Sequence, residues 1–266
     1  MTSENRLTRF LIVLLGCLFL TACSSNSEWG WYVVNPMLEQ GRINLWFLIA
    51  GYPSTIYISA LAAALSMTVG LGVAVMGMSA WWPLRLINRI YVEFIRSIPL
   101  LPLLFWIYFG LPFLIRGTWL EFNVDPFWAG VITLALSDSA FTAEIYRSGI
   151  QSIAKGQSEA AQTIGLTKWQ TMRYVVLPQA IRRILPPLAN QFIYIVKMSA
   201  FVSVIGMQEL MRRANDLNTN EYRALEIYTV LILEYLVLVL LISAAVRWLE
   251  RRMSEGEGRW FGSYVL

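Results

Sequence analysis

Five apolar segments dominate this chain of 266 residues, and each is about as long as the roughly 20 residues that a helix needs to cross a bilayer. With 57% apolar residues and only 14% charged ones, the sequence holds more apolar surface than one soluble core can bury. It therefore predicts an all-α integral membrane protein with five spanning helices. The segments cover approximately residues 54–78, 98–115, 127–143, 185–207 and 225–249. Pro186 and Pro187 are expected to open the fourth of them.

The first apolar segment carries only small side chains on one helical face. Ala62, Ser66, Gly70 and Ala74 recur at every fourth position, so they line up along one side of a helix. Small residues allow helix backbones to approach closely in lipid, where apolarity alone does not bring helices together. We expect this face to pack against another helix, and an alanine-rich composition without a packing role is the alternative.

The distribution of Lys and Arg predicts the orientation, because cytoplasmic loops of membrane proteins carry the excess of basic residues. Most of the 21 basic residues fall on one side when the segments around Arg85 and Lys168 lie inside the cell. The C-terminus is then cytoplasmic and the segment after residue 23 is external. The net charge of +4 follows from these clusters and does not indicate nucleic-acid binding.

Residues 1–23 form either a cleaved signal peptide or an extra N-terminal helix. Arg6 and Arg9 precede a short apolar run over 10–20, which is shorter than a comfortable span. The tetrad LTAC at its end fits a lipobox, so Cys23 is the candidate for lipidation. The predicted layout continues with an external segment at 24–53, a transmembrane domain at 54–252 with a cytoplasmic loop at about 155–178, and a cytoplasmic tail at 253–266.

The composition argues against covalent chemistry and against a metal site in this chain. Histidine is absent, which removes the most frequent general base and zinc ligand. The two cysteines, Cys17 and Cys23, have no metal-ligand spacing. No Gly-Lys pair is present for a phosphate-binding Walker A loop, so ATP and its Mg²⁺ must be bound by another chain.

The loop "KGQSEAAQTIGLTKWQTMRYVVLP" at 155–178 predicts two short helices separated by a turn. Ser158 is expected to cap the first helix, with Glu159 near the positive end of its dipole. Gly165 is expected to end that helix in the left-handed conformation. The stretch TKWQ is typical of a capping box that starts the second helix, and Pro178 is expected to limit it.

Ala160, Ala161 and Ile164 share one face of the first of these helices, where they form a small apolar surface. Such a surface suits docking into a groove on another protein. A pair of helices that lies on the membrane interface is the alternative, and spacing alone does not choose between the two.

The same loop resembles the EAA signature of ABC importer permeases. Glu159-Ala160-Ala161 is followed by Gly165 and then by Leu177-Pro178, with Val175 where isoleucine is usual. Three stretches, "YVEFIRSIPLLPLLFWIYFGLP", "AEIYRSGIQSIAKGQSEAA" and "LPQAIRRILPPLANQFIYIVK", resemble the permeases of the histidine, glutamine and glutamate importer type. With the hydropathy layout, the resemblance covers about residues 54–252.

The resemblance implies a type I ABC importer permease that moves a polar amino acid across the bacterial inner membrane. It also implies a second permease, identical or paralogous, two cytoplasmic ATPase subunits and an external solute-binding protein. ATP-driven closure of the ATPases would move the loop and rock the spans. The residues that the resemblance assigns to this coupling are Glu159, Ala160, Ala161, Gly165, Leu177 and Pro178.

Ionisable residues at membrane depth are costly and usually face the protein interior or an aqueous cavity. Asp138, between two serines, is therefore a candidate ligand for the ammonium group of an amino acid, and a structural contact between helices is the alternative. Asn190 and Lys197 lie seven residues apart on one face of the fourth span. Lys197 is expected to attract a carboxylate or to pair with Asp138.

Glu93 and Arg96, just before the second span, match the E-x-x-R pattern of the resembling permeases. We expect them to form a structural ion pair at the membrane surface, and a role in transport is the alternative.

Two other protein classes fit the sequence less well. A secondary transporter built from inverted repeats should show two corresponding halves, and no such repeat is visible. A plain lipoprotein should be mostly polar after its lipidated cysteine, whereas this chain is mostly apolar there.

Overall fold

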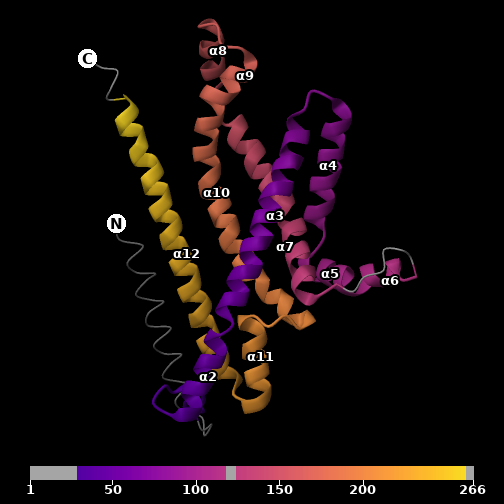
Figure 1. Cartoon of the computed structure of the whole chain (residues 1–266), viewed down its shortest axis with the longest axis vertical. Helices are drawn as coiled ribbons and strands as arrows, with labels where there is room; N and C mark the ends of the chain where they lie inside the picture. The colour runs from indigo at the N-terminus through magenta and orange to yellow at the C-terminus, as the bar shows by residue number, and fades with distance from the viewer. Residues whose placement is uncertain (1–28, 118–123, 262–266) are drawn as a thin grey trace, which may run out of the picture.

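The computed structural model describes residues 29–117 and 124–261. Every regular element in these two ranges is a helix, so the predicted all-α fold is confirmed. Residues 1–23, with the candidate Cys23, lie outside the described ranges. The long axis of the molecule is formed by α3 (Tyr52–Met78), α4 (Trp82–Ser97), α7 (Pro126–Gln151), α10 (Leu177–Met198) and α12 (Ala224–Phe261) (Figure 1).

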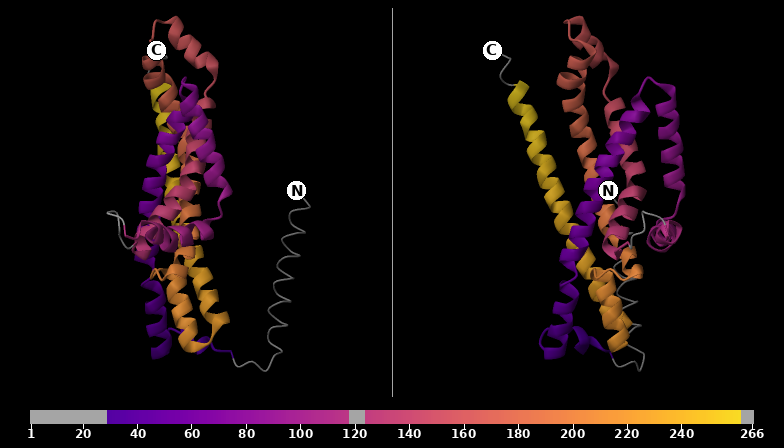
Figure 2. Two further views of the ribbon diagram at one scale, coloured as in Figure 1. Left: turned by 90° about the vertical axis from the view of Figure 1, so that its right-hand side faces the viewer. Right: turned by 45° about the vertical axis from the view of Figure 1, so that its right-hand side comes forward.

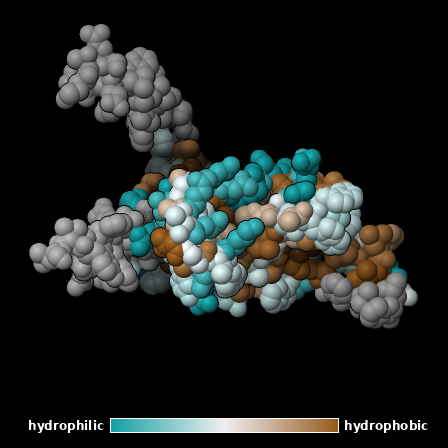
Figure 3. All heavy atoms as spheres, turned by 90° about the horizontal axis from the view of Figure 1, so that it is seen from above, coloured by the Kyte–Doolittle hydropathy of each residue, from teal (hydrophilic) through white to brown (hydrophobic). Residues whose placement is uncertain are grey.

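The two ends of this helical bundle are covered by different elements (Figures 1 and 2). One end carries α8 (Lys155–Thr163), α9 (Lys168–Thr171), the turn between α3 and α4, and the C-terminal end of α12. The opposite end carries η1 (Trp31–Val34), α2 (Glu39–Ile49) and α11 (Leu210–Glu221). Seen from the α8–α9 end, hydrophilic residues gather over the middle of the face and hydrophobic residues gather at one side (Figure 3).

The centre of the bundle is the contact between α3 and α7. Ala62, Ser66, Gly70 and Ala74 of α3 are all buried, which confirms the predicted packing of the small face. At Gly70 an added Cβ would lie 2.8 Å from the Thr142 side chain of α7. The small residues therefore set how closely these two helices approach.

Three helical stretches are long and apolar enough to cross a membrane, namely Glu39–Met78, Lys168–Ile205 and Ala224–Trp248. A fourth is obtained when α4 is counted together with the bent segment that follows it. The fifth helix, α7, has the length but carries polar side chains such as Asp138 and Thr142. Because these side chains are buried against neighbouring helices, α7 does not need an apolar surface all round.

The second span differs from the predicted single segment at 98–115. α4 supplies most of its length, and the chain then bends by 101° into α5 (Leu100–Phe105), the π-helical turn η2 (Trp106–Gly110) and α6 (Leu111–Ile115). The bend follows from Pro99, because the residue before a proline is disfavoured in the helical region. Ile98 is accordingly extended, with φ −89° and ψ 124°.

The fourth span begins earlier than predicted. Pro186 and Pro187 lie inside α10 and do not open it, since the helix already starts at Leu177. Ile184 and Leu188 on either side of the prolines are buried. This packing offsets the cost of about 3 kcal/mol for a proline in a helix interior. The span continues as the 3-10 helix η4 (Ser199–Ile205) and ends at Gly206, whose φ is +94°.

The buried carboxylate of Glu209 holds the start of α11 against α12. It accepts hydrogen bonds from the amides of Met211 (2.9 Å) and Arg212 (2.7 Å), so it caps α11. The Tyr235 hydroxyl of α12 donates a third bond at 3.0 Å. Burial raises the pKa of Glu209 to about 7 despite these donors.

Candidate functional site

The predicted loop at 155–178 forms the tip of the molecule at one end of the bundle (Figure 1). α8 begins at Lys155, after the extended residue Ala154. Ser158 therefore lies inside the helix, and its predicted role as the N-cap is wrong. Glu159 lies in the second turn of α8 and not at its start, so it is not next to the positive end of the helix dipole as predicted. Its side chain is exposed.

The turn between α8 and α9 has the predicted geometry. Gly165 has φ +89°, and its amide donates to the Gln162 carbonyl over 3.0 Å. The amide of Leu166 donates to the carbonyl of Ala161 over 3.1 Å, so a carbonyl group in the last turn of α8 has a hydrogen-bond donor. The capping box is also present, because Thr167 and Gln170 each accept a backbone hydrogen bond from the other.

The apolar surface of this tip differs in part from the predicted one. Ala161 is buried against the rest of the chain, whereas Ala160 is exposed. Ile164 is 79% exposed and Trp169 of α9 is 70% exposed. Two large apolar side chains thus protrude beside Ala160. The sequence interpretation missed Trp169, although an aromatic residue in the first turn of a polar loop helix was the available signal.

Pro178 does not end the second helix, contrary to the prediction. α9 continues through the π-helical turn η3 (Met172–Val176) directly into α10, which contains both Leu177 and Pro178. In this wider turn the amide of Leu177 donates to the carbonyl of Met172. Proline lacks an amide hydrogen, and a π-helical turn accommodates the local change in hydrogen bonding. The loop is therefore joined to the fourth span by continuous helix.

Asp138 lies at the junction of three helices and is 3% exposed. Its carboxylate accepts hydrogen bonds from Ser66 of α3 (2.5 Å), from Thr142 of α7 (2.9 Å) and from the side-chain amide of Gln191 of α10. Asp138 thus makes the structural contact between helices that was the alternative to binding an ammonium group, and its hydrogen-bond donors are all neutral. Gln191 was missed, although an amide in an apolar span was a recognisable signal.

Asn190 and Lys197 are both exposed on α10, and the described hydrogen bonds of Asp138 go to other residues. No described ion pair joins Lys197 to Asp138 in residues 29–117 and 124–261. Both residues belong to an exposed stripe along α10 and η4, whose other members are Pro187, Tyr194 and, in η4, Phe201. This stripe is a polar and aromatic surface, whereas Ile184, Leu188, Ile195 and Val196 of the same helix are buried.

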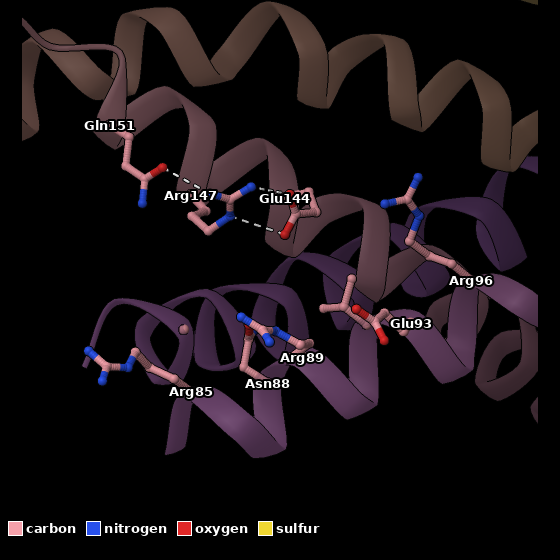
Figure 4. A pocket seen from close by; sticks show the side chains of 10 residues that line it. Arg85, Asn88, Arg89, Glu93, Arg96, Glu144, Arg147 and Gln151 are labelled. Atoms are coloured by element: carbon pink, nitrogen blue, oxygen red, sulfur yellow. Dashed lines mark hydrogen bonds and ion pairs between the residues drawn. The ribbon is translucent and has the colours of Figure 1, made fainter. Parts of the chain in front are cut away.

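A pocket of about 400 Å³ lies between α4 and α7 near the α8–α9 end (Figure 4). Arg147 binds Glu144 through two hydrogen bonds, of 2.5 and 3.1 Å, and Gln151 through a third.

The expected pair of Glu93 with Arg96 is not among the ion pairs of the described residues. The Arg96 guanidinium instead lies 5.1 Å from the ring centre of Phe141. The remaining lining residues are Gly77, Arg85, Asn88, Arg89 and Val92.

The helices from α3 to α12, the exposed tip and its link to α10 can be compared with known proteins. The family described as "Binding-protein-dependent transport system inner membrane component" matches residues 44–255. The chain belongs to this family. The matched range contains the loop at 155–178 and the helices α3, α4, α7 and α10, as expected of a multi-pass membrane permease.

The permease is similar to proteins of known systems along most of its length. It is 40% identical over 205 residues to the probable glutamine ABC transporter permease protein GlnM of Bacillus subtilis, and the matched region covers 77% of this chain and 92% of the relative. It is 38% identical over 206 residues to the glutamine transport system permease protein GlnP of Escherichia coli K12, with the same two coverages.

One solved structure is described as the crystal structure of an amino acid ABC transporter with histidines. A chain in it is 41% identical to the permease and superposes with a TM-score of 0.72, covering 77% of this chain and 94% of that chain. The chain thus has the fold of the permease of an amino acid ABC transporter.

Proposed function

We propose that this chain is the permease subunit of an ATP-driven importer for polar amino acids in the bacterial inner membrane. The observation that carries the proposal is the similarity to glutamine permeases and to an amino acid ABC transporter, at 38% to 41% identity over about three quarters of the chain. The permease has no nucleotide-binding motif, so the energy for transport comes from a partner ATPase that binds ATP and Mg²⁺.

The tip formed by α8 and α9 is the contact with that ATPase. Glu159, Ala160 and Gly165 are exposed there, next to the protruding side chains of Ile164 and Trp169. A protruding apolar group flanked by polar residues is typical of an anchor that fills a pocket on a partner. Ala161 supports the contact from the inner side of α8, and Leu177 and Pro178 lie in the helix that links the tip to the membrane.

The exposed stripe of α10 faces the translocation path, which a second permease subunit completes. Lys197 supplies a positive charge that attracts the carboxylate of the amino acid, and Asn190 offers an amide for hydrogen bonding. Asp138 is engaged with three neutral donors, so it supports the helices behind this stripe. An external solute-binding protein delivers the amino acid at the opposite end, beside α2 and α11.

Competition for uptake tests the function directly. Vesicles that contain the permease, its paralogue if the operon encodes one, the ATPase and the binding protein should take up radiolabelled glutamine only when ATP is inside. Unlabelled polar amino acids should compete, whereas leucine should not. Uptake that is indifferent to ATP, or competition by none of the polar amino acids, would show that the proposal is wrong.

Two further assignments have their own tests. Single cysteines introduced at Trp169 and at Asn215 of α11, in a background without Cys17 and Cys23, should react with a membrane-impermeant maleimide from the cytoplasmic and the external side, respectively. Mass spectrometry of the N-terminus tests whether Cys23 is cleaved and acylated. An intact peptide that begins at Met1 would exclude this processing.

A further inference from the structure

The pocket between α4 and α7 carries more positive charge than its own residues neutralise. Arg147 and Glu144 cancel one another through their two hydrogen bonds. The other charged residues that line the pocket are three arginines, Arg85, Arg89 and Arg96, and one carboxylate, Glu93. Three positive charges against one negative charge leave a net charge of +2 in this space.

Two of these arginines have unused hydrogen-bonding capacity. Within the described ranges, no hydrogen bond or ion pair joins the side chain of Arg85 or of Arg89 to another residue. Both side chains line the pocket from α4, with Arg85 directed toward the start of that helix and Arg89 one turn farther along (Figure 4). Guanidinium groups present several N–H donors in a planar fork that matches the oxygens of phosphate and carboxylate groups. The pocket thus offers paired donors and an excess of positive charge to an anion.

The surface of α4 beside the pocket is apolar. Ile87, Ile90 and Phe94 are 52%, 58% and 64% exposed, and they recur at spacings that place them on one helical face. Trp81 and Trp82 lie exposed at the start of the same helix, as residues of the membrane interface do. α4 therefore presents an apolar face to lipid tails and an arginine-lined face to the pocket.

We propose that this pocket binds a phosphate group, and that the group belongs to an acidic phospholipid of the leaflet on the α8–α9 side. The phosphate lies between Arg85 and Arg89, with Arg96 deeper in the pocket, while the acyl chains lie along Ile90 and Phe94. Basic pockets between helices at the cytoplasmic side of a membrane are suited to such head groups. α7 forms the opposite wall and leads directly to α8, so the lipid stabilises the base of the tip.

Lipid retention by the purified complex tests the proposal. The permease is purified with its ATPase from membranes that contain phosphatidylglycerol, and bound lipids are counted by native mass spectrometry. The double variant Arg85→Gln/Arg89→Gln should retain phosphatidylglycerol roughly twenty-fivefold more weakly, because each arginine near an anionic head group contributes about a factor of five. The matched control Arg42→Gln/Arg116→Gln removes two exposed arginines elsewhere and should retain the lipid.

A charge-preserving variant guards against a general folding defect. Arg85→Lys/Arg89→Lys should keep most of the bound phosphatidylglycerol, and its assembly with the ATPase is measured by gel filtration. Equal retention by the glutamine variant and the unmodified complex would overturn the site. Displacement of the lipid by inorganic phosphate at millimolar concentration would instead identify a soluble phosphate as the ligand and overturn the lipid source.

Discussion

Ser66 of α3 donates a hydrogen bond of 2.5 Å to Asp138 of α7, and Gln191 of α10 donates to the same carboxylate. One buried side chain therefore joins three of the five long helices. The bonds come from neutral groups, which suits a part of the protein from which water and free ions are excluded.

Replacing Asp138 by alanine should destabilise the helical bundle. The change leaves the Gln191 side-chain amide without its acceptor on α7, and a buried group that loses its partner costs about 1–3 kcal/mol. Ser66 keeps a contact with the Thr142 hydroxyl at 3.0 Å but loses its shorter bond to the carboxylate. We expect a lower thermal midpoint of the purified complex and less permease in the membrane. Thr133→Ala is the control, because the Thr133 hydroxyl is equally buried but bonds only to Ala129 of its own helix. A stable Asp138→Ala variant without uptake would favour a role in substrate binding.

Gly165→Asp should leave the permease in the membrane but separate ATP hydrolysis from uptake. Gly165 has φ +89°, and a residue with a Cβ pays about 1–2 kcal/mol in this conformation. The turn between α8 and α9 should shift as a result. Uptake and ATPase activity are measured on the same vesicles. Gly156→Ala in α8 is the control, since its Cβ would meet no atom within 4 Å. Normal uptake by Gly165→Asp would contradict the coupling role.

Thr167→Ala should loosen the start of α9. The substitution removes the hydroxyl that accepts the Gln170 amide at 3.3 Å, and loss of such a cap costs about 1 kcal/mol. Hydrogen exchange of the amides in α9 should become faster, while exchange in α7 stays unchanged. In the control Thr163→Ala, the lost hydroxyl bonds only to the Glu159 carbonyl of its own helix. Equal exchange in the two variants would argue against the cap.

Gly149→Ala should disturb the contact between α7 and α10, because an added Cβ would overlap the side chain of Ile184. We expect the free energy of unfolding to fall by about 1–3 kcal/mol from overpacking. The second substitution Ile184→Ala removes the overlapping atoms and should recover part of the loss. A double-mutant cycle of thermal unfolding measures the coupling, and Gly72→Ala, which has open space, is the control. Strict additivity would contradict the predicted overlap.

The stability of the complex should contain a term that falls as the pH rises from about 4.5 to about 7. Burial raises the pKa of Glu209 from 4.5 to about 7, so the folded protein binds a proton that the unfolded chain releases at lower pH. Thermal unfolding is compared at pH 5 and pH 8. Glu209→Gln should show a smaller difference between these pH values, whereas the exposed control Glu39→Gln should match the unmodified protein.

Local signals in the sequence predicted the parts of the structure that depend on neighbouring residues. Short sequence patterns were enough to predict the turn at Gly165, the capping box at Thr167 and the small face of α3. Each of these features depends on residues within a few helical turns of one another. The apolar segments likewise fixed the class of the fold. The family resemblance supports the proposed role of the tip, which spacing alone left open.

The sequence was a poorer guide where distant residues decide the outcome. Ser158 has the chemistry of a cap, but α8 starts one turn earlier. Proline usually ends a helix, and both Pro178 and Pro186 were expected to mark a boundary. A π-helical turn and the packing around Ile184 instead keep the helix from α9 to α10 continuous. The partners of Asp138 come from positions 66 and 191, and nothing near residue 138 indicates them. The paired charge at the end of α7 is Arg147 with Glu144, three residues apart, and not the expected Glu93 with Arg96.

The uninterrupted helical path from Lys168 to Ile205 has a mechanical consequence. At 1.5 Å per residue, its 38 residues form a rod of roughly 57 Å. A tilt of about five degrees imposed at one end of such a rod moves the other end by roughly 5 Å. The permease can therefore work as a lever, in which a small stroke applied to the tip becomes a displacement about as wide as an amino acid at the far side of the membrane.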